Sequence, residues 1–136
     1  MRVPATRDNP AISRYTRRSP RSPGSLPRQP MIEQLLNLSD FASFNEAPEN
    51  VHDSMHGWVG GDMGRTTTAA YDPVSYAHHC MIDRLWYLWQ IRHGNGSIPP
   101  SLPGLPLAPF GKNFEEVLDI LELGYDYSAC VAEIEV

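Results

Sequence analysis

The sequence predicts a mainly α-helical protein: a partial antiparallel helical bundle with long loops and a disordered N-terminal tail. Residues 73–93 repeat apolar side chains at the spacing of an amphipathic helix. Proline- and glycine-rich stretches, above all residues 97–111, separate the apolar segments and do not favour regular structure. Residues 1–30 contain seven arginines and six prolines but almost no large apolar side chains, so they are not expected to bury enough surface to fold.

Charge divides the chain at the same place. Residues 1–30 have a formal charge of +6 and residues 31–136 have −11, which together give the net charge of −5. We therefore expect a tail at 1–30 and a folded domain at 31–136, with Met31 as a candidate start of the native protein. The prolines argue against an amphipathic transit peptide. A basic tail could bind nucleic acid weakly through phosphate contacts. Segments of this composition are more often solvated tails without a partner, so we expect no nucleic-acid partner.

The cysteines and the hydropathy indicate in which cellular compartment the protein is found. Cys80 and Cys130 are the two cysteines, and two cysteines in an acidic chain are typical of free thiols in a reducing environment. The tail lacks the apolar core of a secretory signal. The chain also lacks an apolar run of the roughly 18 residues needed to span a bilayer. A cytoplasmic protein without a membrane partner is expected.

Two shorter helical segments are expected before the central loop. Residues 31–44 repeat leucine and isoleucine at rough helical spacing, and Ser39–Asp40 offers a cap or a turn within them. A break is expected at Asn45–Pro48, because proline interrupts helical hydrogen bonding. The second helix is expected over residues 49–58 and ends at Gly60–Gly61.

The longest helix is expected at residues 73–93. Asp72 is a suitable N-cap, and Pro73 is favourable at the first helical position. Arg92 and His93 suit the last turn, and the glycine after them marks the end. Tryptophans 86 and 89 are expected in the core. Together with Leu85 they form an apolar stripe that needs further helices, so we predict self-association or low stability.

The C-terminal third is expected to be largely irregular. Residues 97–111 are rich in proline, leucine and glycine. Residues 113–123 predict a short helix, with Asn113 as its cap and two glutamates in its first turn. Residues 125–136 alternate weakly between apolar and polar side chains, which predicts an edge strand or an irregular segment.

The histidines carry the chemistry. All five lie beyond residue 51, and His52 and His56 are four residues apart. On a helix this pair shares one face and can chelate a transition metal, although such a pair occurs as often by chance on a protein surface without binding metal. His79 adds a third imidazole from the next helix. Three imidazoles from two antiparallel helices can form a trigonal site with one open position, suited to copper or zinc.

These histidines belong to a longer pattern, HDSMHGWVGG followed by DPVSYAHHCMIDRLWYLWQ. Over residues 44–93 the pattern resembles the second-copper region of tyrosinases, catechol oxidases and molluscan-type haemocyanins, with a looser likeness through Tyr127. The resemblance implies a bundle of the tyrosinase type that holds two coppers by three histidines each. It implies oxidation of phenols or catechols by dioxygen to o-quinones. His52, His56 and His79 would be the ligands of one copper.

The resemblance also implies roles for acidic neighbours. Glu49 and Asp53 flank His52 and are candidate catalytic acceptors of the phenol proton, with solvated helix charges as the alternative reading. Asp53 stands where the family usually has asparagine. Asp83 is expected either to orient a ligand imidazole or to pair with Arg84.

The remaining histidines are not expected to bind metal. His78 is interpreted as a packed or hydrogen-bonded neighbour of His79, and His93 as a residue of the helix end.

Two departures from the family pattern matter. Ser75 replaces a phenylalanine that packs around the copper pair. More decisively, no histidine precedes His52, so the first-copper half is missing from this sequence. At most one copper is expected here, and catalysis is expected only if self-association or a partner chain supplies the other half.

Two alternative functions remain open on sequence grounds. One is a mononuclear metal-binding domain or an inactive remnant. The other is a zinc hydrolase, because HDSMH resembles the HExxH motif, although Asp53 is a poor substitute for its glutamate.

Overall fold

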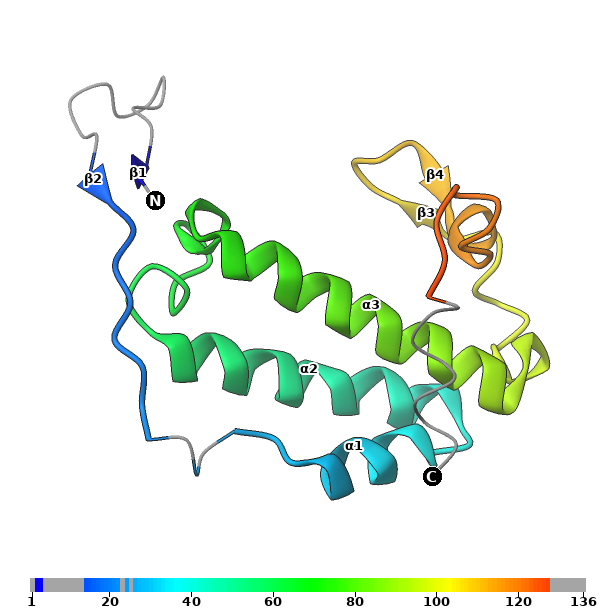
Figure 1. Ribbon diagram of the computed structural model, residues 1–136. Coiled ribbons are helices and arrows are strands. Elements are labelled where there is room, and N and C mark those ends of the chain that lie inside the picture. The colour runs from blue at the N-terminus through cyan, green and yellow to red at the C-terminus, as the bar shows by residue number, and fades with distance from the viewer. Residues whose placement is uncertain (1, 4–13, 23, 25, 128–136) are drawn as a thin grey trace.

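The computed structural model describes residues 2–3, 14–22, 24 and 26–127 (Figure 1). This part of the chain is mainly helical, which confirms the predicted fold class. Its α-helices are α1 (Gln29–Leu36), α2 (Phe41–Val59) and α3 (Pro73–His93). Helices α2 and α3 run antiparallel side by side, and α1 packs against both. Among the described residues, no helix has the length and apolar character that crossing a bilayer requires.

Short elements complete the described structure. They are two antiparallel pairs of two-residue strands and three 3-10 turns. The strands are β1 (Arg2–Val3) with β2 (Arg14–Tyr15), and β3 (Pro106–Leu107) with β4 (Lys112–Asn113); the turns are η2 (Ala69–Tyr71), η3 (Asn95–Ser97) and η4 (Phe114–Val117).

Helix α2 is continuous where the sequence predicted a break at Asn45–Pro48, so that prediction is wrong. Its start agrees with the expected cap, because the Asp40 carboxylate accepts a hydrogen bond from the Ser43 amide at 2.8 Å. The proline inside the helix cannot donate a backbone hydrogen bond. However, Phe44 before it and Val51 after it pack against the same apolar cluster. Tertiary packing therefore outweighs the local preference.

Helix α3 has the predicted bounds. The Asp72 carboxylate accepts a hydrogen bond from the Val74 amide at 2.9 Å and caps the first turn. Gly94 has a φ of 73°, which favours glycine, and its amide donates to the Gln90 carbonyl at 2.7 Å.

The main core lies where α1, α2 and α3 meet. Its buried members are Leu35, Leu36, Phe44, Leu85, Trp89 and Ile98. Trp89 is fully buried, stacks on Phe44 with ring centroids 4.6 Å apart, and donates its indole hydrogen to the Leu38 carbonyl at 2.6 Å. Trp86 contacts Phe41 edge-on. Helices α1 and α2 of the same chain therefore bury Leu85 and Trp89, whereas Trp86 is half-buried. The predicted self-association or low stability remains a prediction.

The predicted helix at 113–123 is reduced to the single turn η4. The expected capping box is present, since the side chains of Asn113 and Glu116 bond reciprocally to the backbone. Beyond Val117 the chain turns away, and the Gln90 side chain donates to the Leu118 carbonyl at 2.9 Å.

The final residues were predicted to form an edge strand or an irregular segment. Residues 125–127 have no regular structure, and residues 128–136 lie outside the described residues. Cys80 is exposed and not in a disulfide, whereas Cys130 lies in the part not described.

The described part of residues 1–30 contacts the helical body. Residues 16–22 run extended beside the loop between α2 and α3 (Figure 1). The Arg18 guanidinium bonds to the buried Asp72 carboxylate, and the Ser19 amide donates to the Val59 carbonyl at 3.0 Å. The sequence did not predict these contacts. The boundary at residue 30 and Met31 as the native start remain predictions.

Candidate metal centre

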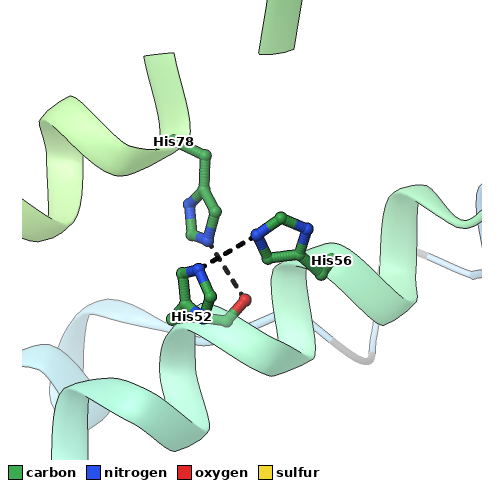
Figure 2. A group of neighbouring side chains, drawn as sticks. All are labelled: His52, His56 and His78. Atoms are coloured by element: carbon green, nitrogen blue, oxygen red, sulfur yellow. Dashed lines mark hydrogen bonds between the residues drawn. The ribbon is translucent and has the colours of Figure 1, made fainter. Parts of the chain in front are cut away.

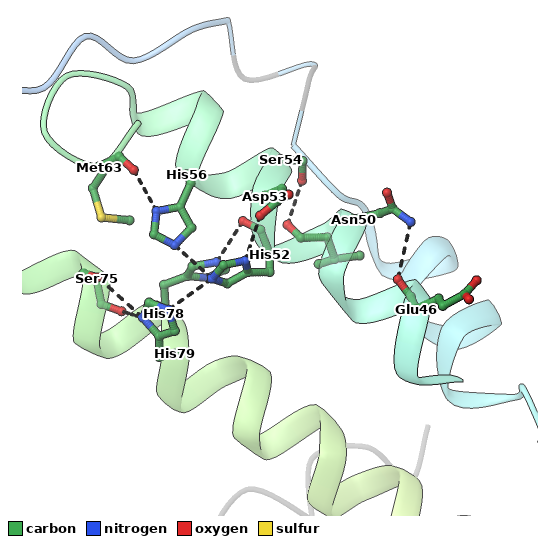
Figure 3. Close-up of polar contacts among 11 residues, drawn as sticks. Glu46, Asn50, His52, Asp53, Ser54, His56, Met63, Ser75, His78 and His79 are labelled. Carbon is green, nitrogen blue, oxygen red and sulfur yellow. Dashed lines mark hydrogen bonds and ion pairs between the residues drawn. The ribbon is translucent and has the colours of Figure 1, made fainter. Parts of the chain in front are cut away.

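Four of the five histidines gather where α2 and α3 lie side by side. His52 and His56 are one turn apart on α2, and His78 and His79 lie on α3. The centroids of neighbouring rings are between 4.4 and 5.7 Å apart. The helical spacing and the antiparallel packing therefore bring all four imidazoles together (Figure 3).

Three of these rings have the same hydrogen-bonding arrangement. In each, Nδ1 faces an oxygen that can only accept a hydrogen bond, so the network assigns the ring proton to Nδ1. A neutral ring of this tautomer presents an unprotonated Nε2. The acceptors are the Asp53 carboxylate for His52 at 3.0 Å, the Met63 carbonyl for His56 at 2.7 Å and the Ser75 carbonyl for His79 at 2.6 Å.

The Nε2 atoms of these three rings converge. His52 Nε2 lies 3.0 Å from His56 Nε2 and 3.1 Å from His79 Nε2. With the protons held on Nδ1, the nitrogens present lone pairs to one another and lack a hydrogen to share. Lone pairs at this separation repel, and a bound cation would relieve the repulsion. Oriented neutral imidazoles of this kind suit copper or zinc.

His78 makes a different set of contacts. Its side chain is buried, and its Nε2 donates to the His52 carbonyl at 3.1 Å (Figure 2). Its ring is nearly parallel to that of His52, with centroids 5.1 Å apart. Burial lowers the pKa of His78, which favours the neutral ring. His52, His56 and His78 also form a group whose possible ligand atoms all lie within 4.8 Å of one another.

His93 lies apart from this cluster, at the end of α3. Its Nε2 donates to the Leu36 carbonyl at 2.8 Å, and its ring packs on Trp89 at 5.2 Å. It thus ties α3 to α1.

The two predicted catalytic acids both lie near His52. Asp53 is exposed, and its carboxylate accepts from His52 Nδ1. Glu49 is exposed and lines a hollow of about 390 Å³ beside His52. Aromatic rings form much of its wall, namely Phe41, Phe44, Trp86 and Phe114.

Asp83 does not orient an imidazole in the described structure, so that part of its predicted role is wrong. Its carboxylate accepts from the hydroxyls of Tyr125 at 2.9 Å and Tyr127 at 2.8 Å. Burial and the Asp83 charge raise the pKa of Tyr125 to about 12. The Tyr127 hydroxyl also lies 3.1 Å from the Cys80 carbonyl. Asp83 therefore anchors the C-terminal segment to α3.

Sequence reasoning missed the carbonyls of Met63 and Ser75. Backbone acceptors have no residue-type signature, so no pattern could have indicated them. Ser75 is buried, and its hydroxyl lies 3.5 Å from His79 Nδ1. The residue that departs from the family pattern thus lies against a predicted ligand.

Comparisons with known proteins find related sequences. The family model "Common central domain of tyrosinase" matches residues 2–92. A tyrosinase of Streptomyces antibioticus is 42% identical over 111 residues, which cover 71% of this chain and 37% of that protein. Grixazone synthase of Streptomyces griseus is 39% identical over 80 residues, covering 57% of this chain and 25% of that protein. "Hemocyanin A-type, units Ode to Odg" of Enteroctopus dofleini is 41% identical over 63 residues, covering 43% of this chain and 5% of that protein. The chain therefore spans well under half the length of each.

Proposed function

Because this chain belongs to the tyrosinase family, we propose that it is a copper-binding domain that takes part in the oxidation of phenols or catechols by dioxygen to o-quinones. The observation that supports this most strongly is the convergence of three Nε2 atoms whose ring protons the hydrogen-bond network assigns to Nδ1. When bound, copper would supply the redox chemistry, by accepting electrons from the phenolic substrate and passing them to dioxygen.

In this proposal His52, His56 and His79 hold the copper. Each keeps its proton on Nδ1 and has its Nε2 free. His78 is the competing third ligand, but its Nε2 hydrogen is donated to the His52 carbonyl. His78 would have to break that bond, or turn its other nitrogen toward the metal. We therefore assign His78 to packing against His52.

Oxidation of phenols at a two-copper site of the family type requires a second set of imidazoles to hold the second copper. The chain has five histidines. Two of them, His78 and His93, donate their Nε2 hydrogens to backbone carbonyls. We therefore propose that another polypeptide segment completes the paired site, either in a partner chain or in a second copy of this one.

The hollow beside His52 suits a phenolic ring. Its aromatic walls offer stacking and edge contacts, and its position next to a ligand imidazole brings a bound ring close to the metal. In this proposal Glu49, on the wall of the hollow, accepts the phenolic proton. Asp53 acts differently, because its carboxylate is bonded to His52 Nδ1: it orients the ligand.

A mononuclear metal-binding domain without catalysis is the second candidate. It is favoured by the engagement of His78 and His93 in other bonds, which leaves three imidazoles for one metal. A zinc hydrolase is less compatible with the structure. Its general base would have to be Asp53, whose carboxylate is bonded to His52 Nδ1.

Copper content tests the metal-binding part of the proposal. The full chain, reconstituted with Cu(II) and desalted, is expected to retain about one copper per chain by elemental analysis, because one set of three imidazoles is free to bind. A chain that retains no copper would reject the proposal. Two coppers per chain would contradict the assignment of a single ligand set.

Oxygen consumption tests the need for a second set of histidines. The copper-loaded chain, held dilute and monomeric, is expected to oxidise catechol no faster than the same concentration of copper bound to a histidine peptide. Rates per chain that rise with protein concentration, in parallel with dimer formation in sedimentation, would indicate that a second copy completes the site. Fast oxidation by the monomer would show that no second set is needed.

A further inference from the structure

An extended segment, residues 16–19, runs beside the loop that joins α2 to α3 (Figure 1). We call this segment the strap. Its backbone bonds to the loop and to the end of α2: the Asp62 amide donates to the Arg17 carbonyl at 2.9 Å, and the Ser19 amide donates to the carbonyl of Val59, the last residue of α2, at 3.0 Å. The Arg17 amide in turn donates to the Asp62 carboxylate at 2.8 Å. The backbone of the strap takes part in all three of these bonds, and the Thr16 hydroxyl adds a bond to the Tyr71 carbonyl at 3.3 Å.

The two glycines at the end of α2 make this close approach possible. Gly60 and Gly61 have φ values of 61° and 58°. A Cβ at Gly61 would overlap the Arg17 carbonyl, and a Cβ at Gly60 would lie 2.5 Å from the Ser19 hydroxyl. The Gly-Gly pair therefore ends the helix and also leaves room for the strap.

The Arg18 guanidinium binds the Asp72 carboxylate with two parallel hydrogen bonds, an arrangement that we call the fork. Its Nε lies 2.7 Å from one Asp72 oxygen, and its Nη2 lies 2.6 Å from the other. Asp72 is fully buried and also caps α3 through the Val74 amide. The guanidinium lowers the pKa of Asp72 by hydrogen bonding to its charged form. Without Arg18 this carboxylate would be buried without its cationic partner, which is strongly unfavourable.

Both elements that the strap holds carry an acceptor for a ligand histidine. The loop contains Met63, which is buried and whose carbonyl accepts from His56 Nδ1. The first turn of α3 contains Ser75, whose carbonyl accepts from His79 Nδ1. His52 differs, because its acceptor is Asp53 in the same helix. The strap therefore contacts the elements that carry the Nδ1 acceptors of His56 and His79, but not the acceptor of His52.

We propose that the strap is a positioning element of the metal centre and that Arg18 is its positioning residue. By fixing the loop and the cap of α3, it holds the carbonyls of Met63 and Ser75 where they keep the Nδ1 protons of His56 and His79. Both Nε2 lone pairs then stay directed at the metal. This inference rests on the proposed function, since it assumes that these histidines bind copper.

Arg18→Gln in the full chain tests the proposal, with Arg17→Gln as the matched control. Arg17 is adjacent, exposed and bonded to the loop through its backbone. In the metal-free protein, histidine ¹⁵N spectra report the tautomer of each ring. Arg18→Gln is expected to give mixed tautomers at His56 and His79 while His52 keeps its Nδ1 proton. Its Kd for Cu(II), from chelator competition, is expected to rise roughly 10–100-fold, as for other residues that orient ligands. Arg17→Gln is expected to change neither.

Two results would overturn the proposal. One is unchanged tautomers and unchanged copper affinity in Arg18→Gln. The other is an equal change at all three rings, which would indicate a general loss of structure. If Arg18→Gln does not fold, Arg18→Lys keeps a cation beside Asp72 but loses the fork, and the same selective effect on His56 and His79 is expected. The tautomers are read without metal, so failure of the wild-type chain to bind copper would reject the proposed function and leave this measurement interpretable.

Discussion

His52→Ala is expected to abolish copper binding. His52 Nε2 lies within 3.1 Å of the Nε2 atoms of both His56 and His79, so it joins the ligand of its own helix to the ligand of the other. Its loss leaves two imidazoles on separate helices and opens the site to water. We expect the Kd for Cu(II) to rise by more than about 100-fold, beyond the range for residues that only orient ligands. Chelator competition with the full chain measures it.

Three further variants give this prediction its controls. His93→Ala removes a histidine bonded to the Leu36 carbonyl and is expected to leave copper affinity within about threefold, in line with its distance from the cluster. His79→Ala is expected to match His52→Ala, and His78→Ala is expected to retain copper with weaker binding. If His78→Ala instead abolishes binding and His79→Ala does not, the ligand set is His52, His56 and His78.

The parts of this site that follow local rules could be predicted from the sequence. The bounds of α3 follow from Asp72, Pro73 and Gly94, because capping depends on residues within one turn. The four-residue spacing of His52 and His56 puts both on one face of α2 by helix geometry. Their pairing with His79 followed from the family pattern and not from spacing alone.

The parts that depend on tertiary structure could not be predicted. Pro48 predicts a break when only its neighbours are considered, but Phe44 and Val51 pack on either side of it and keep α2 continuous. The strap has few apolar side chains, so composition placed it outside the core. Its attachment depends on backbone hydrogen bonds and on an ion pair between Arg18 and Asp72, which are 54 residues apart, and neither leaves a periodic signal.

Trp89→Ala is expected to have the largest effect on stability of any single change in the core. The ring is fully buried, stacks on Phe44 and Trp86, and donates a hydrogen bond to the Leu38 carbonyl. Truncation would leave a cavity at the meeting point of the three helices and remove the hydrogen bond to the Leu38 carbonyl. We expect the free energy of unfolding to fall by about 3–5 kcal/mol. Urea denaturation of the metal-free chain, followed by circular dichroism, measures this difference.

The consequence for the metal centre follows from the same packing. A small domain has a total stability of about 5–15 kcal/mol, so Trp89→Ala is expected to populate unfolded chains and to weaken copper retention indirectly, since copper binds the folded chain. Ile91→Ala is the matched control on α3: its side chain is 54% exposed, and its effect is expected to stay within about 0.5 kcal/mol. Saturating copper should recover part of the stability lost in Trp89→Ala, but none in His52→Ala, where the ligand itself is missing. Equal midpoints for Trp89→Ala and Ile91→Ala would show that this tryptophan does not hold α3 against α1 and α2.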